Sequence, residues 1–145
     1  MWRKILAVFL GLIAGGVFNM VLVSVSNAIY PLPAGLDPND FEAFQAHVKA
    51  NGLPTGALLI VLAAHAGGSF VSGLVCGWIA KRAWYLAAAF LGFLWTCGGA
   101  SMLLMIPAPL WFAVADLLLY IPAALLGVKL GAASMAVKST PNVAP

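Results

Sequence analysis

Three long stretches of this chain contain no Asp, Glu, Lys or Arg: residues 5–36, 50–80 and 83–115. About 18 to 20 largely apolar residues are enough to cross the hydrocarbon core of a bilayer as a helix, so each stretch is long enough to span a membrane. Only 8% of all residues are charged and 63% are hydrophobic. This composition excludes a soluble globule and a disordered chain, and it predicts an integral membrane protein.

The third stretch continues into a further apolar segment after Ile106, where Pro107 and Pro109 follow. Proline ends a helix because it lacks an amide donor and its ring clashes with the preceding turn. No stretch alternates polar and apolar residues as barrel strands do. The sequence therefore predicts an all-α, four-transmembrane-helix bundle in a single domain over residues 1–136, followed by a tail over 137–145. The expected helices lie near residues 3–29, 55–80, 84–106 and 110–132.

The basic residues indicate the orientation, because Lys and Arg in short loops resist transfer across the membrane. In the expected topology Lys49 lies on one side, and the other basic residues lie on the opposite side. Both termini and the tail are therefore expected in the cytoplasm. The basic residues on the cytoplasmic side are Arg3, Lys4, Lys81, Arg82, Lys129 and Lys138.

The basic start and the first apolar stretch are also compatible with a secretory signal, with Ser26-Asn27-Ala28 as a cleavage site. The apolar stretch is longer than the ~7 to 15 residues of a typical signal core. We therefore expect this segment to remain as the first crossing.

A short amphipathic helix is expected near residues 38–50, in the first extracytoplasmic loop. Asp37 can cap it with Pro38 at its first position, and Asn51-Gly52 supplies a stop. Phe41, Phe44 and Val48 would share one face of this helix. Two interpretations stay open: a helix that lies at the outer membrane interface, and a lid that folds over the bundle.

Small residues recur at every fourth position in all four expected crossings. In lipid, helices associate through close packing of small residues and through hydrogen bonds between helices. We therefore expect each helix to pack along such a row, with glycines as the points of closest approach. The glycines in these rows include Gly11, Gly15, Gly73, Gly77, Gly92 and Gly127.

Polar side chains in the four crossings lie at a similar depth. At ~1.5 Å of rise per residue, Asn19, His65, Thr96 and Asp116 all reach roughly 20 to 24 Å above the cytoplasmic charges. A carboxylate near the bilayer centre costs about 2.5 to 3.5 kcal/mol, so Asp116 is expected to be protonated, paired or hydrated. His65 is its natural partner, and Tyr120 can donate to the same site. The alternatives are that interfacial water solvates Asp116 and that His65 only fills a packing position.

Other chemistry has little support in the sequence. The two histidines lie in a loop and in a crossing, no cluster has the spacing of zinc ligands, and no glycine loop precedes a lysine to hold a phosphate. No metal or cofactor is predicted. The polar residues also lack a recognisable pair of nucleophile and base, which favours a protein that is not an enzyme.

Two segments, together with the short basic start, resemble an uncharacterised group of small bacterial four-helix inner-membrane proteins. The segments are Ile29-Tyr30-Pro31-Leu32-Pro33 and Leu62-Ala63-Ala64-His65-Ala66-Gly67-Gly68. The resemblance implies the topology already derived and a location in the bacterial inner membrane. It implies no activity, ligand or catalytic residue.

Two functions are compatible with these features. The first is binding or translocation of a small solute or ion at a titratable site formed by Asp116 and His65, with Asn19, Thr96 and Tyr120 completing its hydrogen bonds. The second is a nonenzymatic accessory or scaffold subunit of a larger membrane complex, in which the polar layer only fixes helix register. The expected partners are the lipid bilayer and either a second copy or a larger complex, because four helices enclose little volume. No nucleic-acid partner is expected, since the basic residues form no stripe.

Overall fold

The computed structural model describes residues 2–37 and 40–138, and side chains as far as residue 135. Over this part of the chain it consists of five helices and contains no strand: α1 (Trp2–Ile29), α2 (Phe41–Asn51), α3 (Thr55–Ala80), α4 (Tyr85–Met105) and α5 (Leu110–Lys138). Four of them, all except α2, are long and apolar enough to cross a membrane. The expected architecture, four membrane helices with a short helix between the first two, is confirmed. The chain is a polytopic membrane protein.

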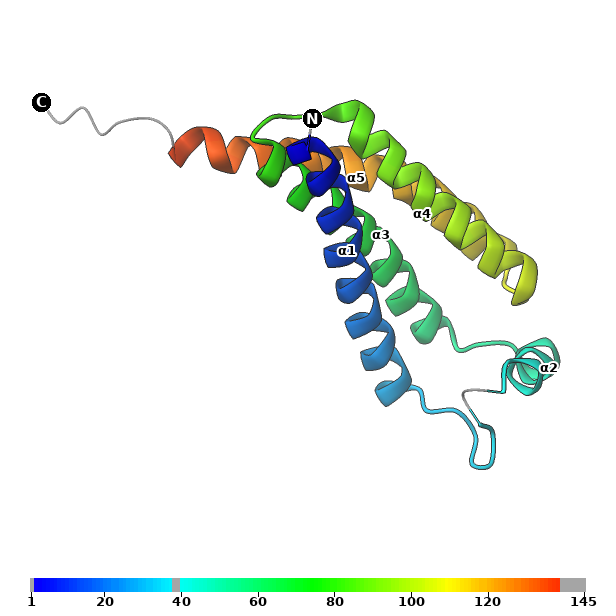
Figure 1. The fold of residues 1–145 in the computed structure, drawn as a ribbon. Helices are drawn as coiled ribbons and strands as arrows, with labels where there is room; N and C mark the ends of the chain where they lie inside the picture. Colours follow the sequence, from blue (N-terminus) through cyan, green and yellow to red (C-terminus); the bar gives the residue numbers. More distant parts are fainter. Residues whose placement is uncertain (1, 38–39, 139–145) are drawn as a thin grey trace, which may run out of the picture.

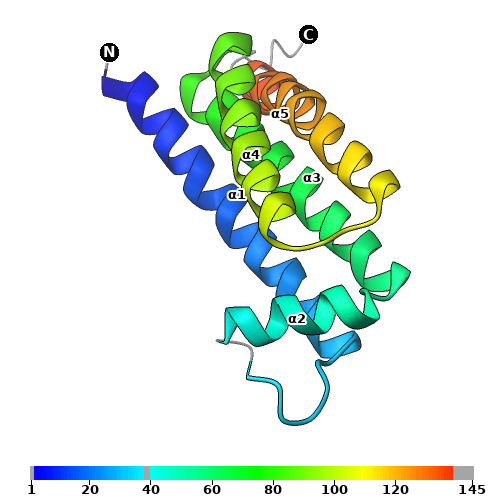
Figure 2. The same cartoon turned by 90° about the vertical axis from the view of Figure 1, so that its right-hand side faces the viewer.

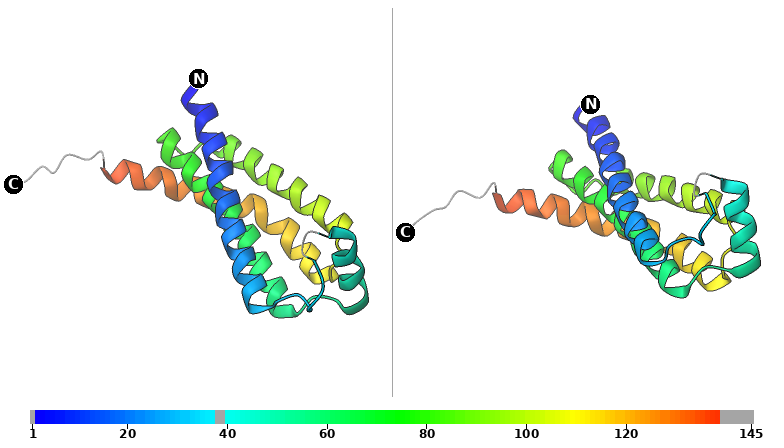
Figure 3. Two further views of the ribbon diagram at one scale, coloured as in Figure 1. Left: turned by 60° about the horizontal axis from the view of Figure 1, so that its bottom comes forward. Right: turned by 90° about the horizontal axis from the view of Figure 1, so that it is seen from below.

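The four long helices alternate in direction (Figure 1). The start of α1, the α3–α4 connection and the end of α5 lie at one end of the molecule, which we call the basic end because Arg3, Lys4, Lys81 and Arg82 lie there. The helix α2 lies across the opposite end, which we call the α2 end (Figures 2 and 3). The central helix is α3, which packs on α1 and on α5, while α4 packs mainly on α5. As a result, the α1–α3 pair and the α4–α5 pair spread apart toward the α2 end (Figure 1).

The parallel helices α3 and α5 meet along a row of residues at every fourth position, with a constant offset of 51 residues. Two steps of the row are hydrogen bonds, and at the other two a glycine of α3 lies so close to α5 that a Cβ atom would collide with a backbone oxygen. Such close approach is how helices associate in lipid, where burying apolar area gains little. The row pairs His65 with Asp116, Ser69 with Tyr120, Gly73 with Ala124 and Gly77 with Val128.

Glycines also lie at the other helix contacts. A Cβ atom at Gly11 or Gly15 would collide with the backbone of α3, and one at Gly127 would collide with the backbone of α3 from the other side. At Gly92 it would lie 2.8 Å from the Cα atom of Ile121 in α5. The glycines that the sequence pattern singles out therefore all lie where two helix backbones meet.

The helix α2 begins three residues later than the position expected from the sequence. Asp40, not Asp37, is its N-cap: the carboxylate of Asp40 accepts a hydrogen bond of 3.0 Å from the backbone N–H of Ala43. Both aspartates have the chemistry of a cap, and the backbone N–H of Asp40 donates to the carbonyl of Asp37, but it is the carboxylate of Asp40 that accepts from the first turn of α2. Residues 38 and 39 lie outside the described part of the chain. Gly52, at φ 71°, ends the helix as the sequence predicts.

Two other boundaries follow from the same chemistry. The helix α4 ends at Met105 because Ile106, which precedes Pro107, takes an extended backbone (φ −114°, ψ 117°), as residues before proline do. The helix α5 continues to Lys138, beyond the end expected near residue 132. The expected tail thus begins within this helix, and residues 139–145 lie outside the described part.

Candidate functional site

Three polar side chains meet at the contact between α3 and α5, where the row described above begins. Nδ1 of His65 lies 2.7 Å from Oδ1 of Asp116. The hydroxyl of Tyr120, one turn after Asp116 on α5, donates to Oδ2 of Asp116 at 2.9 Å and also lies 2.9 Å from Nδ1 of His65. Asp116 is 1% exposed and its two carboxylate oxygens each have a partner. A buried carboxylate needs such partners, because an unpaired charge in a low-dielectric interior is very costly.

The positions of the protons in this cluster follow from taking Asp116 as a carboxylate. The Tyr120 hydroxyl then donates its one proton to Asp116, and the proton between His65 and Asp116 is assigned to Nδ1 of His65. Among the described residues, Nε2 of His65 has no hydrogen-bond partner. The carboxylate therefore fixes the imidazole by one nitrogen and leaves the other nitrogen available.

Aromatic rings and close packing lie on the side of the cluster toward the basic end. The ring of Trp95, on α4, stacks on that of Tyr120 with centroids 6.2 Å apart and planes at 20°. Its indole N–H donates to the hydroxyl of Ser72 at 3.0 Å, and the ring covers Gly68 of α3. Ser69, fully buried, donates to the carbonyl of Tyr120 at 2.7 Å. Trp95, Ser72 and Ser69 therefore hold α3, α4 and α5 together directly beneath the cluster.

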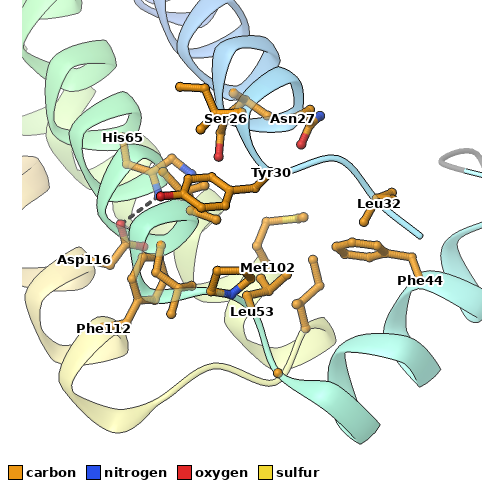
Figure 4. A pocket seen from close by; sticks show the side chains of 18 of the residues that line it. Ser26, Asn27, Tyr30, Leu32, Phe44, Leu53, His65, Met102, Phe112 and Asp116 are labelled. Atoms are coloured by element: carbon orange, nitrogen blue, oxygen red, sulfur yellow. Dashed lines mark hydrogen bonds and ion pairs between the residues drawn. The ribbon is translucent and has the colours of Figure 1, made fainter. Parts of the chain in front are cut away.

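A cavity of about 760 Å³ lies on the other side of the cluster, toward the α2 end. Figure 4 shows His65 and Asp116 pointing toward each other at its wall, with Tyr30 and Met102 nearby. Side chains from all five helices and from the α1–α2 loop line it, and most of them are apolar. Binding sites for small molecules are commonly of this size, with apolar walls and a few polar groups that fix orientation.

The helix α2 and the loop before it form the wall of this cavity that is farthest from the cluster. Phe44 and His47 of α2 line the cavity, and Val48, 2% exposed, anchors the helix. The side-chain amide of Gln45 donates to the carbonyl of Met105 at the end of α4. The helix α2 is therefore attached to the α4–α5 side of the opening. The lid and the interfacial helix both stay predictions.

Asn19 lines the same cavity from α1, together with His65 of α3. Its Oδ1 atom is buried and, among the described residues, is the one buried side-chain oxygen or nitrogen atom without a hydrogen-bond partner. Leaving a buried amide oxygen unpaired costs about 1 to 3 kcal/mol. The amide of Asn19 is therefore a hydrogen-bonding group without a protein partner at the edge of the cavity.

Thr96 lies within α4, but its side chain does not join the cluster. Its hydroxyl donates to the carbonyl of Gly92 in its own helix at 2.9 Å, and it lines neither the 760 Å³ cavity nor the smaller one described below. The helix α4 instead presents Trp95 and Gly99 to α3 and α5. The structure thus brings His65, Asp116 and Tyr120 together, leaves Asn19 at the cavity, and places Thr96 in a hydrogen bond within α4.

Trp95 is the residue of this site that the sequence patterns did not single out. A signal for it exists, because the other four tryptophans lie near the ends of the expected crossings and Trp95 lies within one. A buried indole N–H needs an acceptor, so a tryptophan at that depth indicates a polar contact inside the bundle. Phe112 and Met102 carry no such signal, since apolar residues occur throughout these helices.

Among the residues that the structure describes, no three His, Cys, Asp or Glu side chains lie close enough to hold a metal ion. Comparisons with family models, with curated proteins and with solved structures found no match to this chain. No family is therefore identified, and what stands of the resemblance is a protein with four candidate membrane helices.

Proposed function

We propose that this chain binds a small, largely apolar molecule by its polar group at the His65–Asp116–Tyr120 cluster, in the cavity that opens toward the α2 end. The observation that carries the proposal is a histidine held by a buried carboxylate at Nδ1, with Nε2 free of protein partners at the wall of a 760 Å³ cavity. The fixed orientation of the His65 ring favours binding, because the side chain then loses less conformational entropy when a ligand binds.

The polar groups and the walls have separate roles in this proposal. The apolar walls accept apolar parts of the ligand, and His65 and Asn19 are the polar side chains of the cavity wall that we propose as its hydrogen-bond partners at the cluster. Asp116 acts through His65, because both of its carboxylate oxygens already have protein partners. Tyr120 lies between the other two members of the cluster and Trp95, on whose ring it stacks.

The close packing toward the basic end favours binding of a ligand over its translocation through the bundle. Ser69, Ser72 and Cys76 of α3 are fully buried on that side, and glycine contacts seal α3 against α1 and α5. Translocation of a solute would require these contacts to separate. We therefore propose a state in which the cavity lies beneath α2 at the α2 end and the basic end is closed. From the distribution of Lys and Arg, we further propose that the basic end faces the cytoplasm of a bacterium and that α2 lies outside the inner membrane.

A scaffold subunit is the second candidate, and one observation favours it. The cluster bridges α3 and α5 in register with the glycine contacts below it, so it also serves to fix the alignment of these two helices. The two candidates differ in what they predict for the cavity. A scaffold needs the bond between His65 and Asp116 but has no use for the free Nε2 atom or for the unpaired amide of Asn19.

Solvent extraction of the purified full chain, followed by mass spectrometry of the extract, tests the proposal. We expect one small molecule retained near one per chain in the wild type and lost in His65→Gln, which removes Nε2 but keeps a polar side chain. The control is Ser101→Ala, whose hydroxyl bonds only to its own helix at Cys97. Equal contents in wild type and His65→Gln, with both chains folded, would refute the proposal in favour of the scaffold.

A further inference from the structure

A second cavity, of about 440 Å³, lies between α1 and α4. Leu12 and Gly16 form its α1 side, and Leu94 and Gly98 form its α4 side. His65 and Tyr120 of the polar cluster also line it. The cavity therefore extends from the cluster to the gap between α1 and α4, which pack little on each other because α1 packs mainly on α3 and α4 mainly on α5.

The two cavities meet at the polar site. Four residues line both of them: Asn19, His65, Gly99 and Met102. The side chain of Asn19, whose buried Oδ1 atom lacks a partner, and the imidazole of His65 thus border both spaces. A molecule bound at this junction can place one part toward the α2 end and another part between α1 and α4.

The gap between α1 and α4 is open on the outer surface of the helix bundle, between two candidate membrane helices. No atom lies within 4 Å of the position that a Cβ would take at Gly16 or at Gly98, whereas a Cβ at most other helical glycines would meet a neighbouring helix or side chain. Leu12 and Met102 are 38% and 45% exposed and belong to apolar membrane helices. These two glycines therefore border an opening whose surroundings are lipid chains.

Building on the proposed function, we infer that the ligand is an amphiphile from the bilayer, with a hydroxyl-bearing head and a single hydrocarbon chain. The head binds at Asn19 and His65 in the 760 Å³ cavity, and the chain leaves the junction through the opening between α1 and α4. The path suits a single chain, because Leu12 and Gly16 face Leu94 and Gly98 across one narrow cavity.

The free protein groups select the chemistry of the head. Oδ1 of Asn19 needs a donor. Nε2 of His65 needs a donor when the imidazole is neutral and an acceptor when it is protonated, and a hydroxyl serves in both cases. A carboxylate head offers no donor to Asn19 and adds a negative charge beside Asp116. The structure therefore favours a monoacylglycerol or a long-chain alcohol over a fatty acid.

Photolabelling in lipid nanodiscs tests this inference. The probe is a monoacylglycerol with a diazirine in its chain, and labelled peptides of the full chain are identified by mass spectrometry. We expect labelling near Leu12–Gly16 and Leu94–Gly98. The double variant Gly16→Leu/Gly98→Leu fills the opening and is expected to lower labelling at these peptides about tenfold. Gly16→Ala/Gly98→Ala adds only methyl groups in open space and should keep the labelling, as should the control Ala63→Leu on an exposed face of α3.

Three results would overturn the inference. The first is labelling that is spread evenly over the exposed helix faces and unchanged in the leucine double variant; this result would refute the opening between α1 and α4. The second is equal labelling by a fatty acid with the same chain, which would refute the preference for a hydroxyl. The third is equal labelling in wild type and His65→Gln, which would refute the position of the head. Because the extraction experiment uses no probe, a molecule retained there in a His65-dependent way would preserve the proposed function even if the opening is refuted.

Discussion

Nδ1 of His65 and Oδ1 of Asp116 lie 2.7 Å apart across the contact between α3 and α5. Asp116 is the one acidic residue within the four candidate membrane spans of the described chain, and it is almost fully buried. Its pairing with a histidine at one oxygen and a tyrosine at the other makes this carboxylate tolerable in the membrane. The same pairing orients the histidine toward the cavity, so one contact serves both stability and binding.

Asp116→Asn is expected to destabilise the folded chain by about 1 to 1.7 kcal/mol. Hydrogen bonds between membrane helices contribute on average about 0.6 and at most about 1.7 kcal/mol, and the lost charge of the acceptor places this change near the upper limit. The measurement is reversible unfolding in mixed detergent micelles. The matched control is Glu42→Gln, which makes the same change from carboxylate to amide at an exposed position of α2. A value near zero for Asp116→Asn would show that the pair contributes little.

Tyr120→Phe removes a hydroxyl that contacts both other members of the cluster, while the ring can still stack on Trp95. We expect a loss of roughly 1 kcal/mol in the same unfolding measurement. The double variant with Asp116→Asn should lose less free energy of unfolding than the sum of the two single variants, by about 0.5 kcal/mol or more, because the two residues share a hydrogen bond. Additive losses would mean that the three side chains do not act as one network.

Gly73→Ala is expected to destabilise the chain by about 1 to 3 kcal/mol, because its Cβ atom would collide with the carbonyl oxygen of Ala124. Gly16→Ala is the matched control, since its Cβ atom enters open space and alanine is the better helix former by about 1 kcal/mol. The free energy of unfolding measures both. If the two substitutions had the same effect, the close contact of α3 with α5 would be disproved.

Leu53→Cys and Lys81→Cys test how the chain crosses the membrane. Leu53 lines the cavity at the α2 end, and Lys81 is exposed at the basic end. With Cys76 and Cys97 replaced by serine, a membrane-impermeant maleimide added to intact cells should label Leu53→Cys. It should label Lys81→Cys only after the cells are opened. The reverse pattern would place α2 in the cytoplasm.

Gln45→Ala removes the side chain that attaches α2 to the carbonyl of Met105. We expect faster amide hydrogen exchange in α2, because fewer contacts then hold this short helix over the cavity. Exchange in α3 should stay unchanged. Glu42→Ala, on the exposed side of α2, provides the comparison. Identical exchange in all three chains would argue against α2 as an attached cover.

The sequence contains most of the information on the membrane helices. Long uncharged stretches and the prolines after Ile106 predict the four crossings because hydrocarbon imposes a simple rule on length and polarity. The boundaries were less predictable. Asp37 and Asp40 are both chemically suitable caps, and nothing in the sequence alone shows that Asp40 is the one that caps α2.

The polar layer was predicted by depth, and depth alone cannot assign rotation. His65 and Asp116 lie at matching depths on neighbouring helices and do meet. Thr96 lies at the same depth, but the rotation of α4 places Trp95 against α3 and leaves Thr96 to bond with its own helix. Rotation depends on which faces pack together, and a row of small residues constrains this only when both partner helices are known.

The most direct test of the central claim is the nitrogen-15 NMR spectrum of His65 in lipid nanodiscs, recorded on the His47→Gln chain so that one histidine remains. The structure predicts a proton on Nδ1, a resonance of that nitrogen that shifts strongly in Asp116→Asn, and an Nε2 resonance that changes when the retained ligand is removed. An Nδ1 atom without a proton, together with ring resonances unchanged by Asp116→Asn, would contradict the pairing on which the proposed binding site rests.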